Sequence, residues 1–223
     1  KKGVATIKLP EYTSVGIYTY LFQENDGKTA GVTYYDQKIK LVVTVLQDEN
    51  GLIRVAAVHT ETEGGKKADT FPNEYSAGSL KIAKKVIGNL GDRAKYFKVT
   101  VTLNGDGEKV YEESYGVTGG SYEQNPKTIE IGKPTDFYLK HDDTITIENL
   151  PYGVTYTVAE ADYTGEGYKE AKIVFEDPGK MIDTASETVT ITNNKNQDID
   201  TGILLDNVPY VLLLALSLIH ISE

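Results

Sequence analysis

The sequence contains no cysteine and no tryptophan, and only one methionine among its 223 residues. The absence of cysteine excludes a disulfide framework and a metal site built on thiolates. Lysine and arginine number 23 against 33 aspartates and glutamates, and the resulting net charge of −10 argues against nucleic acid as a partner. No metal or other cofactor is expected, because the three histidines show no metal-ligand spacing: His59, His141 and His220.

The chain does contain 16 tyrosines, 21 glycines and many short runs rich in valine and threonine, separated by turn residues. No segment except the C-terminal tail has a sustained helical period. The pattern predicts an all-β fold of tandem immunoglobulin-like β-sandwiches, the first one truncated, followed by a short C-terminal hydrophobic helix. An Asn-Gly pair within residues 48–51 is a strong hairpin signal. The predicted strands lie at residues 4–9, 16–24, 31–36, 38–47, 52–62, 77–86, 95–103, 127–131, 137–140, 143–150, 152–160, 171–176 and 187–194.

Two of these strands place a glutamate on the face that should be buried. In the strand at 152–160, Tyr156 and Val158 share a face, and Glu160 falls on the same face. The aromatic residues of GIYTYLFQE have the same relation to Glu24. A carboxylate that faces the core twice, after similar residues, indicates more than the accident of a strand end.

A lysine and an asparagine follow the same rule. Lys84 alternates onto the face of Leu80 and Ile82, and Asn193 onto the face of Ile191. In the first block, Asn73 shares the parity of its neighbouring phenylalanine, so it is also expected to face inward. Lysine is almost never fully buried unless it is paired.

An inward amine, acid and amide can react with one another. Burial lowers the pKa of lysine and raises that of glutamate, so both become neutral, and a neutral amine is a nucleophile. A protonated glutamate can polarise the asparagine amide and pass protons to the departing ammonia, which leaves a Lys–Asn isopeptide bond. Each residue alone has a simpler explanation: the lysine reaching water, the glutamate facing solvent and the asparagine serving a turn.

Three segments resemble the collagen-adhesin B-type domain of Gram-positive pilins and surface adhesins. They are GSLKIAKKVIGNLGDRAKYFKVTVTL, DTITIENLPYGVTYTVAEADYTGEGY and ETVTITNN. That family has a lysine on its first strand, a glutamate in a Y-x-V-x-E strand and an asparagine in its last strand. The resemblance implies that Lys84 is the nucleophile, Asn193 the electrophile and Glu160 the proton shuttle, in a domain over residues 76–195.

Residues 1–75 resemble the C-terminal half of a streptococcal-type pilin isopeptide-linker domain, through TIKLPEYTSVGIYTYLFQEN, AGVTYYD and ADTFPNEY. Glu24 and Asn73 match the reactive acid and amide of that family. The lysine partner normally lies on the first strand, well upstream, and that strand is missing here. Lys1, Lys2 and Lys8 are too close to the glutamate strand to replace it, so no bond is expected in this block.

The tail DIDTGILLDNVPYVLLLAL resembles the sorting signal of cell-wall-anchored proteins. The resemblance implies a linker over 196–202, sortase cleavage between Thr201 and Gly202, and a truncated membrane segment over 203–223. Asp198 and Ile199 depart from the usual Leu-Pro of this signal. The implied location is extracellular and anchored to the cell wall, with sortase and peptidoglycan as partners.

These features predict a mechanical protein: a pilin or stalk subunit of a Gram-positive surface, stabilised by a self-formed isopeptide bond. It is not expected to be an enzyme, and other pilin subunits are possible partners. The alternative is an adhesin module that binds glycan or host matrix through exposed tyrosines and loops. A wall-bound enzyme with its catalytic domain upstream is a third possibility.

Overall fold

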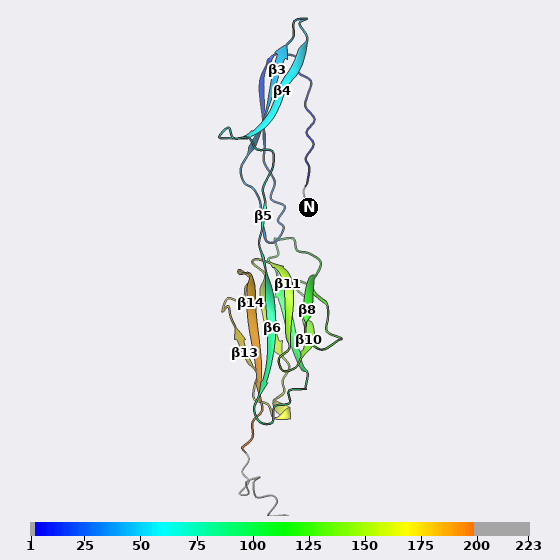
Figure 1. The fold of residues 1–223 in the computed structure, drawn as a ribbon, viewed down its shortest axis with the longest axis vertical. Coiled ribbons are helices and arrows are strands. Elements are labelled where there is room, and N and C mark those ends of the chain that lie inside the picture. The colour runs from blue at the N-terminus through cyan, green and yellow to red at the C-terminus, as the bar shows by residue number, and fades with distance from the viewer. Residues whose placement is uncertain (1–2, 199–223) are drawn as a thin grey trace, which may run out of the picture.

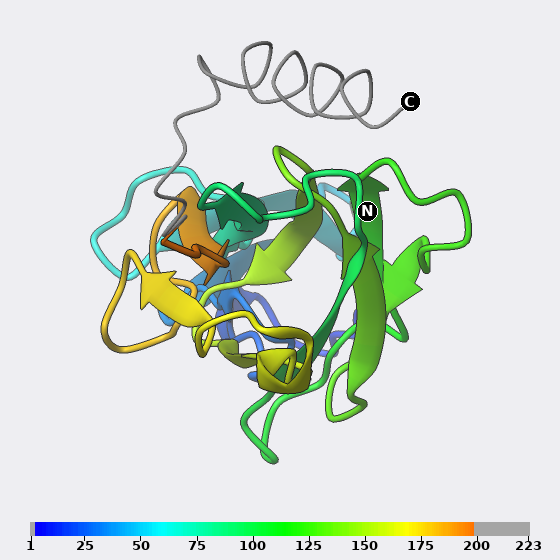
Figure 2. The same ribbon diagram turned by 90° about the horizontal axis from the view of Figure 1, so that it is seen from below.

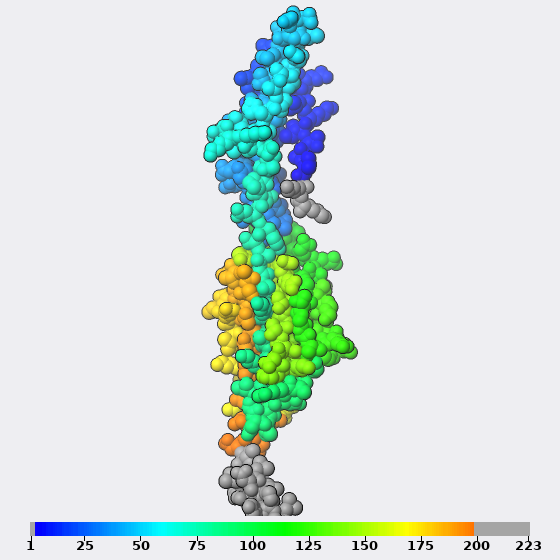
Figure 3. All heavy atoms as spheres, in the orientation of Figure 1, coloured from blue at the N-terminus to red at the C-terminus, as the bar shows by residue number. Residues whose placement is uncertain are grey.

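The computed structural model describes residues 3–198, which form two parts arranged end to end along one long axis (Figures 1 and 3). Fourteen strands and a single-turn 3₁₀ helix, η1 (Thr164–Glu166), make up the regular structure of this range, so the all-β prediction is confirmed. The predicted C-terminal helix lies outside the described residues. Within residues 3–198, no helix is long and apolar enough to cross a membrane.

The first part contains a three-stranded sheet in the order β1-β3-β4 and a two-stranded sheet of β2 and β5. Leu41, Val43 and Val45 of β3 form its small core, against which aromatic residues of β1 pack. The predicted hairpin is confirmed: Gly51 adopts a positive φ of 81° between β3 and β4, a conformation that glycine adopts readily. The strands of this part are β1 (Gly16–Phe22), β2 (Val32–Thr33), β3 (Ile39–Gln47), β4 (Ile53–Thr62) and β5 (Glu74–Tyr75).

The strand predicted at residues 4–9 is wrong. This segment joins no sheet among the described residues. Leu9 and Tyr12 are only partly buried and pack against the core of the first part. A strand needs a neighbour for its backbone N–H and C=O groups, and alternation in the sequence does not supply one. The face remains partly open, since Val55 and Val58 of β4 are 42% and 49% exposed.

The second part contains a six-stranded sheet and a three-stranded sheet that enclose one core (Figure 2). The six-stranded sheet has the order β13-β14-β6-β11-β8-β9, and the three-stranded sheet the order β10-β7-β12. Only β8 was not predicted, because its sequence YGVTG is short and contains two glycines. The strands are β6 (Ala77–Ile87), β7 (Phe97–Asn104), β8 (Tyr115–Gly119), β9 (Thr128–Ile129), β10 (Thr135–Leu139), β11 (Thr144–Pro151), β12 (Thr155–Glu160), β13 (Lys172–Phe175) and β14 (Ser186–Asn194).

The first and last strands of the second part, β6 and β14, lie side by side and run parallel. Lys84 pairs with Ile191, and Val86 pairs with Asn193, so the lysine and the asparagine are two register positions apart. The burial of β6 alternates over most of its length, and Lys84 is on the buried face as predicted. The pairing therefore brings together two residues that are 109 positions apart in the sequence.

The two parts are joined through Ser76, the single residue between β5 and β6. The Ser76 N–H donates to the carbonyl of Gly31, and its carbonyl accepts from the N–H of Tyr152. On the other side, Val110 of the second part exchanges backbone hydrogen bonds with Lys28 and Ala30 of the first. Backbone hydrogen bonds on two sides fix the direction in which one part follows the other.

A buried asparagine protects the edge of the three-stranded sheet. The Asn125 side chain accepts a hydrogen bond from the Tyr138 N–H at 2.7 Å and donates to the Tyr138 carbonyl at 3.0 Å. It thus takes the place of a neighbouring strand at the centre of β10. Edge strands commonly need such a device, because their free backbone groups would otherwise pair with other chains.

Replacing Asn125 by alanine should remove both bonds and leave two backbone groups of β10 without partners. We expect the free energy of unfolding to fall by about 1–3 kcal/mol, the typical net contribution of two intramolecular hydrogen bonds. Chemical denaturation measures this loss. The exposed neighbour Glu123 provides the control, and an Asn125→Ala loss no larger than that of Glu123→Ala would contradict the role of this side chain.

Candidate functional site

The centre of the site is Lys84, whose side chain is fully buried between the two sheets. Its Nζ donates a hydrogen bond to Oδ1 of Asn193 and another, at 3.2 Å, to the carbonyl of Lys85. Asn193 is also buried, at 1% exposure. Amine and amide are therefore in direct contact, each at the position that strand alternation predicts.

Glu160 completes the group from the opposite sheet, at the end of β12, with a side chain that is 1% exposed. Its Oε1 lies 3.4 Å from Nζ of Lys84, and its Oε2 accepts a hydrogen bond of 2.6 Å from Nδ2 of Asn193. A single carboxyl group thus faces both nitrogen atoms, one with each oxygen. This arrangement allows a proton to be taken from one nitrogen and delivered to the other.

The burial of the site favours the neutral forms of both titratable groups. Desolvation lowers the pKa of Lys84, and the nearby Glu160 only partly offsets this effect. Desolvation likewise raises the pKa of Glu160, against the opposing influence of Lys84 and Asn193. A neutral amine beside a protonated acid is the combination that an attack on an amide requires.

An aromatic cluster covers the lysine on its remaining side. Nζ of Lys84 lies 4.3 Å from the centre of the Phe97 ring. Tyr163 and Tyr168 pack edge-on against Phe97, with ring centres at 4.8 and 5.2 Å, and exclude water from this wall. The alternation of β7 places Phe97 inside, but its contact with Lys84 depends on how the two sheets are packed, so the sequence did not identify it as part of the site.

The first part brings Glu24 and Asn73 together in a similar but more open arrangement. Asn73 Nδ2 donates to Oε1 of Glu24 at 2.9 Å, and its Oδ1 accepts from the Tyr35 N–H at 2.9 Å. In residues 3–198, no hydrogen bond or ion pair joins a lysine to either side chain. The predicted inward position of Asn73 is wrong: the residue precedes β5 and is exposed, because no further sheet within residues 3–198 covers it.

Two further sequence predictions concern the tail and metal binding. Thr201 and Gly202, the predicted cleavage site, lie outside the described residues.

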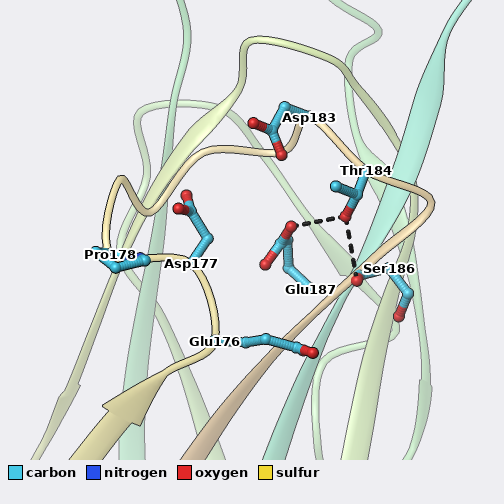
Figure 4. Close-up of a pocket in the computed structure, with 7 residues that line it drawn as sticks. All are labelled: Glu176, Asp177, Pro178, Asp183, Thr184, Ser186 and Glu187. Atoms are coloured by element: carbon cyan, nitrogen blue, oxygen red, sulfur yellow. Dashed lines mark hydrogen bonds between the residues drawn. The ribbon is translucent and has the colours of Figure 1, made fainter.

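A separate acidic hollow of about 280 Å³ is lined by the loop between β13 and β14 (Figure 4). Two of its four carboxylates have partners: Asp177 accepts from backbone N–H groups, and Glu187 accepts from the Thr184 hydroxyl. Across the described range, no group of three or more acidic or histidine side chains could hold a metal ion.

The two parts of the chain match two different family models. Residues 78–199 match the family described as a domain of unknown function (DUF7601), and residues 1–76 match the Spy0128-like isopeptide containing domain. A pilin of Streptococcus pyogenes serotype M1 is 31% identical over 217 residues, which cover 89% of this chain and 63% of that protein.

Two other similar proteins are also named for the pilus. The pilus tip adhesin Cpa of Streptococcus pyogenes is 27% identical over 148 residues, covering 63% of this chain and 20% of that protein. The crystal structure of the major pilin from Streptococcus pyogenes superimposes with a TM-score of 0.61 at 25% identity, over 83% of this chain and 72% of that chain. The chain thus spans less than two thirds of the pilin relative and a fifth of the adhesin.

Removing the amine and the amide together should reveal the titration of the buried acid. In a Lys84→Met, Asn193→Ala variant, Glu160 stays buried but loses both groups that lower its pKa. The folded chain then keeps a proton that the unfolded chain releases near the ordinary value of 4.5. The free energy of unfolding should therefore fall as the pH rises from there towards neutrality, by at most about 1.4 kcal/mol per pH unit.

Chemical denaturation at a series of pH values measures this slope. Adding Glu160→Gln to the same background removes the titrating group and should flatten the profile. An equal slope in both variants would show that Glu160 is not the residue responsible.

Proposed function

We propose that the chain is a subunit of a Gram-positive pilus or surface stalk, stabilised by an internal Lys84–Asn193 isopeptide bond. The chain belongs to the DUF7601 family through residues 78–199, and the pilus role is supported by the match of residues 1–76 to the Spy0128-like isopeptide containing domain and by the pilin relative. One observation carries the proposal. An amine and an amide on neighbouring strands touch each other in the core, and one carboxyl group from the opposite sheet contacts both nitrogen atoms.

The reaction follows from these contacts. Nζ of Lys84 attacks Cγ of Asn193, and protonated Glu160 gives its proton from Oε2 to Nδ2. The Cγ–Nδ2 bond breaks, ammonia leaves, and Oε1 of the resulting carboxylate takes a proton from Nζ. Glu160 returns to its starting protonation state, and the amide Nζ–Cγ bond replaces the Cγ–Nδ2 bond. The chain modifies itself once, so it is not an enzyme, and the reaction needs no cofactor.

The wider role rests on the relatives. Both Streptococcus pyogenes relatives are named for the pilus, one as a pilin and the other as a tip adhesin. We infer an extracellular protein whose partners are other pilin subunits, with two parts divided near residues 75 and 76. In this proposal, sortase cleaves between Thr201 and Gly202 and joins the chain to the peptidoglycan of the cell wall. Adhesion to glycan or host matrix is less favoured, because the chain spans only a fifth of the adhesin.

The whole chain should weigh less than its calculated mass by one ammonia. Lys84→Ala and Asn193→Ala should each restore the calculated mass, and Glu160→Ala should largely block the loss. Because the bond closes a long loop of the unfolded chain, its absence should lower the free energy of unfolding by roughly 4–5 kcal/mol. Intact-mass spectrometry and thermal denaturation measure the two effects.

The pair in the first part provides a matched control. Asn73→Ala removes an asparagine that also contacts a glutamate but has no lysine partner among the described residues. This variant should still lose one ammonia. A folded wild-type chain with its full calculated mass, or an unmodified mass in the Asn73→Ala variant, would contradict the assignment of the bond to the second part.

A further inference from the structure

A hollow of about 230 Å³ opens beside the site, between the end of β12 and the segment that leads into β13. Glu160 and Asn193 line it, and both of their side chains are buried. Other lining residues, including Ala161 and Asp162, are exposed. The hollow therefore leads from solvent to the acid and the amide of the site.

The lysine lies on the other side of the reacting group. Lys84 does not line the hollow, and its amine faces the ring of Phe97 instead. Asn193 presents Oδ1 to the lysine and Nδ2 to Glu160. The nitrogen that must depart is thus held by the residue that borders the hollow, while the attacking nitrogen is enclosed by aromatic side chains.

We propose that this hollow is the exit route for the ammonia released during isopeptide formation, an inference that rests on the proposed function. Once Glu160 has given its proton to Nδ2 and the Cγ–Nδ2 bond has broken, the free ammonia lies at the inner end of the hollow. Its departure prevents the reverse attack on the new amide. Release of a product in this way can limit the rate of a buried reaction.

The charges at the mouth suit this product. Asp162 and Glu170 lie there, and the backbone N–H of Thr164 lowers the pKa of Asp162, which keeps it ionised. Ammonia that reaches water becomes ammonium, and an acidic mouth attracts a cation. Lys169 is also part of the rim, but the two carboxylates outnumber it, so the mouth has a net negative charge.

The test is to fill the hollow and follow ammonia loss with time. The whole chain is isolated unreacted in denaturant, refolded by dilution, quenched in acid and weighed intact. Ala171→Phe and Ala161→Phe each place a large side chain at the lining of the hollow, one from each of two chain segments. Each should slow the loss of ammonia about tenfold, equivalent to about 1.4 kcal/mol on the barrier, while refolding followed by circular dichroism keeps its wild-type rate.

Two further variants separate a blocked exit from a disturbed site. Val174→Phe places the same aromatic side chain on the outward face of β13, beyond the hollow, and should leave the rate unchanged. Adding Ile173→Ala to Ala171→Phe makes room in the hollow again and should restore most of the rate. If Ala171→Phe does not fold, Ala161→Phe, at an exposed position, decides the question.

The outcomes distinguish the route from the reaction. A wild-type chain that folds without losing ammonia overturns the proposed function and the exit route together. A wild-type chain that reacts, with plugged variants that react equally fast or slow down only in step with refolding, overturns the exit route alone. Slow ammonia loss with normal refolding, rescued by Ile173→Ala, supports it.

Discussion

The parallel pairing of β6 with β14 is the contact on which the chemistry of the second part depends. Neighbouring parallel strands must be linked by a long connection, and here the connection is the whole of the intervening sandwich. The pairing register sets Lys84 and Asn193 near each other on the inward face, and the opposing sheet adds Glu160 above them. No separate scaffold for the site is required, because correct packing of the core also aligns the three groups.

The proposed reaction depends on the exclusion of water. Desolvation lowers the pKa of Lys84 and raises that of Glu160, so the packing that stabilises the sandwich also shifts both groups towards their neutral forms. The first part shows the same acid–amide contact without these conditions. Glu24 and Asn73 are hydrogen bonded, but the asparagine is exposed and the described residues bring no amine to it. Contact alone is therefore a weaker indication of reactivity than contact combined with burial.

Alternation in the sequence was sufficient to predict most strands and the inward direction of Lys84, because each strand of a sandwich has one buried face. Alternation was insufficient wherever the structure of a segment depended on contacts with another strand or sheet. Residues 4–9 alternate like a strand but have no neighbour in the described range, and Asn73 has no covering sheet. The contact of Phe97 with Lys84 joins two sheets, and the hollow beside Glu160 is a gap between them. Such features arise from tertiary packing, which the order of residues within one strand does not reveal.

The placement of β6 and β14 also determines which residues lie on the direct connection between the two ends of the second part. β6 enters the second part at one end of the long axis, and β14 leaves it at the other (Figure 1). With a covalent link from Lys84 to Asn193, the shortest connection between these ends bypasses everything from residue 85 to residue 192. If a pulling force follows the proposed link, the bypassed stretch carries none of it, and its surface loops can then vary in length and sequence without weakening the connection between the two ends.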